Sequence, residues 1–445
     1  MQIVKKLVPV FLLISILLVY YQLAHTHREH TLKLISLTVT VSFFLWVCIR
    51  QFNSLILIFL IGIICRFFFF FEFPLLSQDF YRFLWDGSLQ GIGINPYLYT
   101  PDALKEIVFF PQSETLFQGM GTLSNGNYSN YPPLSQFLYS IAAFLIDDSL
   151  FKSVTFIRSI YMLGDVFLFF SGISLLKKMH IPSVHIAWYF LNPLIIIEGI
   201  GNLHAEGFML SFTLLSWLFL HDKKVWMAGF FTALAVAIKL LPLLFIAPFY
   251  RYLGYKKFVI YGISFAIMSI ILWFPYWNGE MGIHYRDTLF LWFNTFEFNG
   301  SLYNIVRSIG HEVKGFNIIK KLGKITPYIV FGLVLAFSLI RSNRTEQSVF
   351  KSLLLILSCY FFMATTLHPW YLIFLVFLGI ITGYAFPILW SIVAFWSYSF
   401  YNSELSVFKP LWHWGGYLIV YSCFFWELMR YPLGKHLQKP DFFSR

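Results

Sequence analysis

Long apolar runs dominate the pattern of hydrophobic and polar positions along this chain. Most of them approach the roughly 20 residues that a helix needs to cross a membrane. They are continuous, whereas a membrane β-barrel strand alternates apolar and polar side chains over about 10 residues. The pattern therefore predicts an all-α, polytopic membrane protein with twelve spans, near residues 7–24, 33–49, 54–73, 153–176, 184–201, 205–221, 258–275, 326–341, 350–366, 371–386, 387–402 and 413–429.

One apolar stretch, residues 225–250, does not fit a single crossing. Lys239 and Pro242 lie in its middle, and three cations follow it, namely Arg251, Lys256 and Lys257. A single crossing would place these cations on the same side as the loop after residue 73. We therefore expect a re-entrant pair of half-helices that enters and returns on the cytoplasmic side, with Lys239 near the tip. Broken helices persist at membrane depth only where protein buries them or where they line a cavity.

The positions of Lys and Arg predict the orientation. Basic residues gather in the segments on the side of both termini, for example Lys177, Lys178, Lys223 and Lys224. Because basic loops stay in the cytoplasm, both termini are expected inside. The apolar run 7–23 follows Lys5 and Lys6 as in a signal peptide, but no small-x-small cleavage site follows it. We therefore expect a retained first helix.

Two long segments, residues 74–152 and 277–325, do not span the membrane in this scheme and face outward. They hold most of the polar residues that suggest a function, and no repeat period is evident in the chain. We therefore expect residues 1–445 to form a single transmembrane domain with these two external loops.

Composition supports this interpretation and excludes several function classes. Hydrophobic residues make up 58% of the chain and charged residues only 12%, about half the roughly 25% that is usual in soluble domains. This excludes soluble enzymes and disordered scaffolds. The net charge of +11 is explained by membrane orientation and by contact with anionic lipid, so no nucleic-acid partner is expected. The four cysteines lie in apolar runs without CxxC spacing, which predicts neither a disulfide framework nor a metal site.

The first long segment contains an unusual group of charged and aromatic residues. In a helix, Asp79, Arg82 and Asp86 share one face, and Tyr81 and Trp85 form an adjacent stripe. Carboxylates accept hydroxyl protons and aromatic faces cover apolar sugar surfaces, so this pattern suits a sugar site. The alternative is a surface helix with an internal Asp79–Arg82 salt bridge and interfacial aromatic anchors.

Short polar and glycine residues frame this helix. Ser77 is a candidate N-terminal cap, and Gly87, Gly91 and Gly93 are expected to end the helix. No strand precedes the glycines, and their Gly-x-x-x-Gly-x-Gly spacing differs from the dinucleotide-binding motif. We therefore expect turns here and no phosphate-binding loop.

Several motifs along the chain resemble one enzyme family. They occur in order over residues 75–375: Asp79-Phe-Tyr-Arg-Phe-Leu-Trp-Asp-Gly87, Asn95-Pro-Tyr97, Tyr131-Pro-Pro-Leu-Ser-Gln136, Asn192-Pro193 with Glu198 and Asn202-Leu-His204, Lys239-Leu-Leu-Pro242, Phe298-Asn-Gly-Ser301 and His368-Pro-Trp-Tyr371. The set resembles the polyprenol-phosphate-mannose-dependent mannosyltransferases, which are multi-spanning glycosyltransferases of the GT-C fold. That family often has an acidic pair where this chain has Gln78 and Asp79.

The resemblance implies an inverting transfer of a sugar, with mannose the first candidate, from a polyprenyl-phosphate donor to a membrane-linked glycan or glycolipid. An acceptor hydroxyl would attack the anomeric carbon, so the reaction needs a carboxylate to take the proton and a cation near the departing phosphate. Asp79 is the expected base, because its loop begins where a helix leaves the membrane. Asp86 stays an alternative base.

The resemblance also implies residues that contact the donor or the acceptor. These expected substrate-binding residues are Arg82, Trp85, Asp86, Asn95, Tyr131, Glu198, Asn202, His204, Asn299, Arg307 and His368. Arg307 is the preferred partner of a lipid phosphate among several outer cations, which include Arg286, Lys320, Lys321 and Lys324. For these cations, an amphipathic segment lying on anionic headgroups is an equal alternative.

Five charged residues fall within or at the ends of predicted spans, namely Arg66, Arg158, Asp165, Glu198 and Lys239. A charge at mid-membrane costs about 2.5–3.5 kcal/mol on insertion scales, so each should face a cavity or a partner. Arg158 and Asp165 are seven residues apart and share a helix face. A structural ion pair between helices is the simpler explanation of such charges.

Two other function classes compete with the glycosyltransferase. One is a transporter or flippase of lipid-linked sugars, which should have paired broken helices in corresponding halves. The other is a ligase or polymerase that uses a pyrophosphate-linked donor. No cofactor is expected, although Asp79 and Asp86 leave a divalent cation open. The expected location is a bacterial inner membrane, with the active site facing outward.

Overall fold

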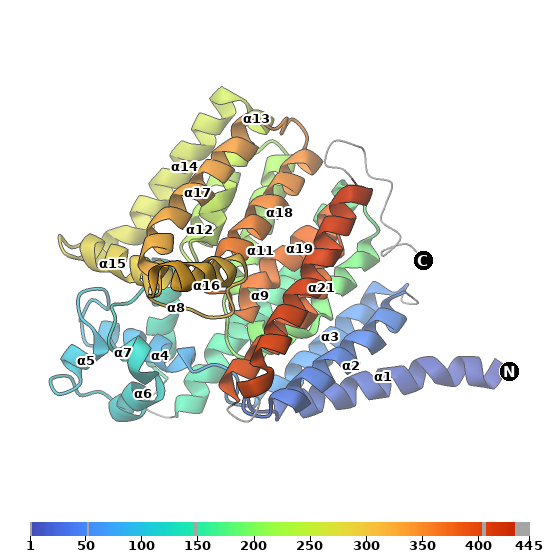
Figure 1. Ribbon diagram of the computed structural model, residues 1–445, viewed down its shortest axis with the longest axis horizontal. Helices are drawn as coiled ribbons and strands as arrows, with labels where there is room; N and C mark the ends of the chain where they lie inside the picture. The colour runs from blue at the N-terminus through green and yellow to red at the C-terminus, as the bar shows by residue number, and fades with distance from the viewer. Residues whose placement is uncertain (1, 51–52, 146–148, 403–405, 432–445) are drawn as a thin grey trace. The chain divides into compact units, whose positions relative to one another are not determined.

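The computed structural model describes residues 2–50, 53–145, 149–402 and 406–431, and these ranges are helical (Figure 1). The described residues contain no strand, only isolated bridges that join Phe298 and Asn299 to Thr366. The all-α prediction is confirmed for them. The chain forms two compact units: the first unit comprises Met1–Leu76, Asp165–Gly207 and His368–Arg445, and the second unit comprises Ser77–Gly164 and Phe208–Leu367.

The first unit contains three N-terminal helices, a middle group and a C-terminal group. The N-terminal helices are α1 (Gln2–Ala24), α2 (Thr31–Ile49) and α3 (Leu55–Phe70). The middle group has the second part of α9 (Leu150–Lys178), η1 (Ser183–Ile186), α10 (Ala187–Phe190) and η2 (Ile195–Gly201). The C-terminal group has η6 (Pro369–Tyr371), α19 (Leu372–Thr382), α20 (Phe386–Val393), η7 (Ala394–Tyr401), η8 (Ser406–Phe408) and α21 (Lys409–Arg430).

The second unit contains nearly all of both segments predicted as external loops, from Ser77 onward, and both are largely helical. The first segment forms α4 (Asp79–Gly91), α5 (Pro101–Leu104), α6 (Ser113–Gly119), α7 (Gly121–Asn125) and α8 (Pro133–Ala143). Then come the first part of α9, α11 (Glu206–His221), α12 (Val225–Val236), η3 (Leu241–Phe245), η4 (Ala247–Phe249), α13 (Tyr250–Leu253), α14 (Tyr255–Trp273) and η5 (Phe274–Tyr276). The unit continues with α15 (Met281–Asn294), α16 (Leu302–Lys314), α17 (Ile319–Leu339) and α18 (Glu346–Met363).

Five described helices are long and apolar enough to cross a membrane, or six if one bent pair is counted as a span. They are Thr31–Ile49, Leu150–Lys178, Tyr255–Tyr276, Ile319–Leu339 and Glu346–Met363. Other predicted spans form shorter apolar helices, such as Leu55–Phe70 and Pro369–Thr382. The chain therefore has the helices of a multi-pass membrane protein, and the count of twelve spans stays a prediction.

The surface of α14 shows why these helices suit a lipid environment. Only 11% of its most apolar window is buried within the protein. Ile260, Ile263, Ile267, Ile270 and Ile271 are each more than 40% exposed. An apolar patch of this kind on a protein surface marks a membrane or protein contact.

The helix breaks at Lys239, as predicted for the stretch 225–250. Helix α12 ends at Val236, and a 3₁₀-helix begins at Leu241, directly before Pro242. Proline removes a backbone donor and disfavours helix in the residue before it. Whether the two arms enter and leave on one side of the membrane stays a prediction.

A second break, which the sequence analysis missed, interrupts the predicted span 184–201. The helices Ser183–Phe190 and Ile195–Gly201 meet at an angle of 61°. The Asn192 side chain causes the turn in part, because its Oδ1 accepts the Leu194 amide at 2.9 Å and its Nδ2 donates to Ser391 at 2.9 Å. The second arm is a π-helix, a rare form that is frequent at functional sites.

The C-terminal spans also differ from their predicted limits. Helix α19 ends before Gly383, which has a φ of 81°, a left-handed conformation that favours glycine. The predicted span 387–402 begins as α20 and continues as the 3₁₀-helix η7. Glu427 of α21 caps α20, because its carboxylate accepts the amides of Ala385 and Phe386 at 2.8 and 2.9 Å.

Candidate active site

The predicted helix that carries Asp79 is confirmed as α4. It begins at Asp79, whose amide donates to the Ser77 hydroxyl at 3.3 Å. The Asp79 side chain is half-buried and lies in the first turn, where the helix dipole favours a negative charge. The helix continues through Gly87 to Gly91, so the expectation that Gly87 helps to end it is wrong.

Asp86 lies on the same helix but in a closed network. Its side chain is fully buried, and Arg82 Nε donates to Oδ1 at 2.7 Å. The other carboxylate oxygen, Oδ2, accepts Ser129 Oγ at 2.5 Å and Gln136 Nε2 at 2.8 Å. Buried charges are tolerated when they are paired and hydrogen-bonded in this way. Both oxygens of Asp86 are therefore engaged by protein donors.

Arg82 extends this network to the end of α7 and to the loop that follows it. Its Nη1 donates to the carbonyl oxygen of Ser124 and to that of Asn127, the latter at 2.9 Å. The residue is only 3% exposed. Arg82 and Asp86 thus hold α4, α7 and α8 together, and the ion pair is the i,i+4 contact between these two residues.

The aromatic stripe of α4 is part of the core of the second unit. Trp85 is 1% exposed and packs against Phe110 and Phe117, with ring centroids 5.0 and 5.9 Å apart. The Tyr81 ring lies against Gly119, where an added Cβ would come within 2.6 Å of it. The stripe therefore fixes α4 on α6.

Asn95 and Tyr131 meet through Tyr97. The Tyr97 amide donates to Asn95 Oδ1 at 3.1 Å, and the Tyr97 hydroxyl donates to the Tyr131 carbonyl at 2.5 Å. Asn95 also donates to the Tyr276 carbonyl at 2.8 Å. Burial raises the pKa of Tyr97 well above its ordinary value, so its hydroxyl stays protonated and donates at neutral pH.

Asn299 lies in a short backbone pairing. Its φ is 52°, a conformation that asparagine tolerates better than most residues. The preceding Phe298 exchanges backbone hydrogen bonds with Thr365 at 3.1 Å and with Leu367 at 2.8 Å. Gly300 has no room for a Cβ, which would lie 3.0 Å from the Ala364 carbonyl oxygen. The pairing holds residues 365–367, directly before His368 in the chain.

Arg307 is held by an acid that the sequence analysis missed. Glu297 accepts Arg307 Nη1 at 2.5 Å and the Tyr303 hydroxyl at 2.7 Å, and Asn317 also donates to it. Burial would raise the pKa of Glu297, but the bonds from Tyr303 and Asn317 and the Arg307 charge lower it. Arg307 is 40% exposed, so its guanidinium reaches solvent while Glu297 orients it.

Helix α16, which carries Arg307, has an exposed apolar face. Its exposed apolar side chains recur at helical spacing, namely Leu302, Ile305, Val306, Ile309 and Val313. Lys320, Lys321 and Lys324 of α17 are exposed as well. This arrangement is typical of an amphipathic segment at a membrane surface, the alternative given above for the outer cations. Arg286 forms an exposed ion pair with Asp287.

In the first unit, Glu198 is fully buried on the π-helix η2. The Tyr398 hydroxyl donates to its Oε1 at 2.7 Å, and His204 Nε2 lies 3.7 Å from Oε2. The His204 amide donates to the Glu198 carbonyl at 3.1 Å. The predicted Glu198–His204 patch is therefore one cluster.

His204 and His368 both stack with one indole, that of Trp370. The Trp370 ring centroid is 3.6 Å from that of His204 and 4.3 Å from that of His368, with interplanar angles of 15° and 4°. Both imidazoles are less than 9% exposed. The stack joins the motif after η2 to the motif at residues 368–371, although these are far apart in the sequence.

Asn202 bridges two backbone segments. Its Oδ1 accepts the Leu76 amide at 2.9 Å, and its Nδ2 donates to the Ile197 carbonyl at 3.0 Å. Leu76 precedes Asp79 by three residues in the chain. Asn202 therefore fixes the backbone that leads into α4.

The prediction that intramembrane charges have partners is confirmed for Arg66 and Asp165. Arg66 Nε and Nη2 donate to Asp165 Oδ2 at 3.0 and 2.7 Å, and both side chains are buried. Arg66 also donates to the carbonyls of Gly62 and Phe190 at 2.9 Å. Arg158 is fully buried, and Lys239 is half-buried in the break after α12.

The predicted site residues fall into two groups, one in each unit. The second unit contains Asp79, Arg82, Trp85, Asp86, Asn95, Tyr131, Asn299 and Arg307; the first unit contains Glu198, Asn202, His204 and His368. Within the described ranges, no group of three or more His, Cys, Asp or Glu side chains is placed to hold a metal ion. The residues of both groups are suited to hydrogen bonding and proton transfer.

Comparison with known proteins identifies the family. Residues 14–253, more than half of the 445 in the chain, match the family model described as alpha-(1->6)-mannopyranosyltransferase, N-terminal domain. No curated protein matches the chain. The matched region includes α4 with its two carboxylates and η2 with Glu198.

Proposed function

Because the chain belongs to the MptA/B family of alpha-(1->6)-mannopyranosyltransferases, we propose that it moves mannose from a polyprenyl-phosphate donor to a membrane-linked glycan or glycolipid. The proposed architecture is a single GT-C domain over residues 1–445, with about twelve spans and a re-entrant pair at residues 225–250. The external segments 74–152 and 277–325 face outward, and the membrane is the inner membrane of a bacterium.

The proposed reaction is a single displacement. The acceptor hydroxyl oxygen forms a bond to the anomeric carbon as the bond between that carbon and the donor phosphate oxygen breaks. The hydroxyl proton passes to Asp79, and polyprenyl phosphate leaves with the bonding electron pair. One displacement inverts the anomeric carbon, so a second catalytic carboxylate is not required.

One observation carries the choice of base. The two carboxylates of α4 differ in access: Asp86 is fully buried, and three protein donors engage both of its oxygens. Asp79 is half-buried at the first residue of the helix. A general base must come within hydrogen-bond reach of the hydroxyl that it deprotonates. We therefore assign Asp79 as the base and Asp86, with Arg82, to the frame that positions α4.

Arg307 is the proposed partner of the donor phosphate. A guanidinium forms paired hydrogen bonds with phosphate oxygens, and Glu297 orients this one while leaving it 40% exposed. His204 and His368 of the first unit, whose rings stack on Trp370, are proposed substrate-binding residues. Glu198 and Asn202 are proposed positioning residues, since Glu198 accepts the Tyr398 hydroxyl and Asn202 bridges the Leu76 amide and the Ile197 carbonyl.

The Asp79→Asn variant tests the base. We expect it to lose mannose transfer by at least the 10²- to 10⁴-fold that general-base catalysis contributes, with unchanged abundance, unfolding temperature and donor binding. The matched control is Asp102→Asn, which removes an exposed carboxylate of α5 in the same unit and should leave transfer unchanged. Full activity of Asp79→Asn would remove Asp79 as the base.

A second assay tests the reaction class. Purified protein receives radiolabelled polyprenyl-phosphate mannose with and without candidate acceptors. Release of polyprenyl phosphate that depends on the acceptor supports transfer. Broken helices also occur in transporters, and movement of intact donor across a vesicle membrane without release would favour a flippase. Turnover only with a pyrophosphate-linked donor would favour the ligase or polymerase.

A further inference from the structure

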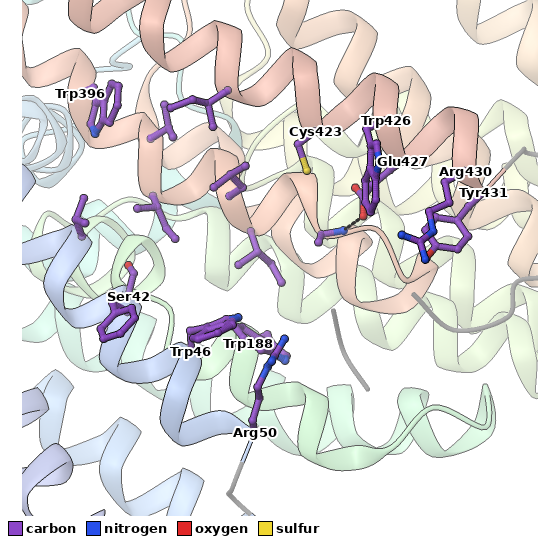
Figure 2. Close-up of a pocket in the computed structure, with 18 residues that line it drawn as sticks. Ser42, Trp46, Arg50, Trp188, Trp396, Cys423, Trp426, Glu427, Arg430 and Tyr431 are labelled. Carbon is purple, nitrogen blue, oxygen red and sulfur yellow. Dashed lines mark hydrogen bonds between the residues drawn. The ribbon is translucent and has the colours of Figure 1, made fainter. Parts of the chain in front are cut away.

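The first unit contains a large cavity, and none of the proposed site residues is among the residues that line it. Its volume is about 630 Å³, within the roughly 300–1,000 Å³ that ligand pockets occupy. Helices α2, α20 and α21, together with η7, supply most of its lining (Figure 2). Apolar and aromatic side chains dominate this lining, among them Val39, Phe43, Ile388, Ile392 and Ile419.

Helices α2 and α21 each contribute lining residues at successive helical turns, and each contributes an arginine at the same end of the cavity. Along α2 the lining residues are Val39, Phe43, Trp46 and Arg50, and along α21 they are Ile419, Cys423, Trp426 and Arg430. Both series advance by three or four residues, which is one helical turn. Figure 2 shows Arg50 and Arg430 beyond the tryptophan of their own helix. The cavity is therefore apolar along its length and cationic at one end.

The arginines are positioned by aromatic rings. The guanidinium of Arg50 lies 4.3 Å from the Trp46 ring centroid, and that of Arg430 lies 5.1 Å from the Trp426 ring. The acid in the lining, Glu427, accepts the amides of Ala385 and Phe386 through its two oxygens. Its charge thus faces the start of α20, where the helix dipole favours it.

We propose that this cavity binds an anionic phospholipid, with an acyl chain along the apolar lining and the headgroup phosphate at Arg50 and Arg430. Apolar helices line the space for the acyl chain. Each arginine lies at the end of its helix, where lipid headgroups meet the bilayer core. Guanidinium groups form paired hydrogen bonds with phosphate oxygens.

The site is distinct from that of the proposed donor. Arg50 directly follows α2 and Arg430 is the last residue of α21. In the predicted topology both lie on the side of the two chain termini, which is the cytoplasmic side by the positive-inside rule. The donor is proposed to bind at the outward face. The lipid would therefore come from the inner leaflet, and its binding does not require the sugar-transfer proposal to hold.

Native mass spectrometry of the full-length protein in detergent tests this site. The probes are phosphatidylglycerol, which is anionic, and zwitterionic phosphatidylethanolamine with the same acyl chains. We expect wild type to retain one phosphatidylglycerol in preference to phosphatidylethanolamine. A basic residue near a lipid surface contributes about 1 kcal/mol, or about fivefold. Arg50→Gln and Arg430→Gln should each lose about fivefold in affinity, and the double variant about 25-fold.

Two further variants separate the site from general effects of charge or folding. Lys33→Gln removes an exposed cation near the opposite end of α2 and should keep wild-type binding. Ile419→Trp adds bulk on the exposed part of the lining and should reduce binding of both lipids without lowering the unfolding temperature.

The proposal would be overturned if wild type bound the two lipids equally or if the double arginine variant kept the wild-type preference. It would also be overturned if Lys33→Gln lost as much affinity as the single arginine variants. Preferential retention of polyprenyl phosphate over phosphatidylglycerol would overturn it as well, because the cavity would then serve the carrier lipid. Displacement of the bound lipid by glycerol phosphate alone would show an anion site without an acyl-chain component, against the proposal.

Discussion

Asp79 and Asp86 are the same residue type on one helix, yet their surroundings give them different tasks. The helix start leaves Asp79 half-buried, while three donors enclose Asp86. Asp86 is fully buried and its donors fill three of the roughly four lone-pair positions of a carboxylate, so an incoming hydroxyl would have to displace protein groups to reach it. The surroundings of the two aspartates, and not their chemical type, therefore distinguish the proposed catalytic role of Asp79 from the structural role of Asp86.

The Arg82–Asp86 pair provides a test of this structural role. Removing one partner of a buried ion pair costs about 3–5 kcal/mol, because the other charge stays buried alone. Arg82→Met should therefore lower the unfolding temperature in detergent sharply. The double variant Arg82→Met with Asp86→Leu should recover part of the loss, since hydrophobic replacement of a whole pair is often neutral. A single variant as stable as wild type would contradict the role.

Asn202 is expected to act on catalysis through the backbone. It fixes the Leu76 amide, three residues before Asp79, and a misplacement of about 1 Å can cost about 10²-fold in rate. Asn202→Ala should lower kcat by up to that factor while KM changes little. Asn202→Asp keeps an acceptor for the Leu76 amide and should restore part of kcat. If both variants lowered stability equally and left kcat unchanged, Asn202 would have only a structural role.

At the scale of elements, the contact between α4 and α8 depends on one glycine. A Cβ at Gly87 would lie 2.1 Å from the Tyr139 carbonyl oxygen, and backbone atoms cannot move aside as a side-chain end can. Gly87→Ala should therefore separate the helices, destabilise the protein by about 1–3 kcal/mol or more and reduce transfer.

Gly91 of the same helix is the matched control. A Cβ there meets nothing within 4 Å, and alanine is favoured over glycine in helices by about 0.5–1 kcal/mol. Gly91→Ala should be neutral or stabilising in the same thermal-unfolding and transfer assays. If Gly87→Ala behaved like Gly91→Ala, the close approach of α4 and α8 would be wrong.

The start of α16 is expected to respond to acid. Hydrogen bonds and the Arg307 charge hold the pKa of Glu297 below its ordinary value of 4.5. Its stabilising contribution is thus complete above pH 4.5 and is lost as the pH falls through the lowered pKa. Amide protection factors of α16 should fall below about pH 4.5 in wild type. In Glu297→Gln they should be lower at neutral pH and nearly independent of acid.

At the scale of the whole molecule, the predicted topology places residues 74–152 and 277–325 on the outer side. Cysteine labelling tests it in a background with alanine at Cys48, Cys65, Cys359 and Cys423. An impermeant thiol reagent added to intact cells should label Asp102→Cys and Lys314→Cys. It should label Lys224→Cys only after the membrane is opened. Labelling of Lys224→Cys from outside would reverse the orientation.

How much of this protein was predictable depends on the range of the interactions involved. Local pattern was enough for the apolar helices, the helix of Asp79 and the break at Lys239, because helix propensity, proline and hydropathy act within a few residues. The break at Asn192 was missed because one of its hydrogen bonds reaches Ser391, and no local pattern shows such a partner. Glu297 was missed because its role depends on the donors Tyr303, Arg307 and Asn317, which only folding brings to its carboxylate.

The sequence by itself determined that this is a helical membrane protein of a mannosyltransferase type, since composition and ordered motifs are properties of the chain alone. Only the tertiary structure decided which polar residues are enclosed. It buried Asp86 against Arg82, Ser129 and Gln136 and stacked His204 and His368 on Trp370. Burial and hydrogen-bond satisfaction are set by residues distant in the chain, so spacing alone cannot separate a buried carboxylate from an accessible one.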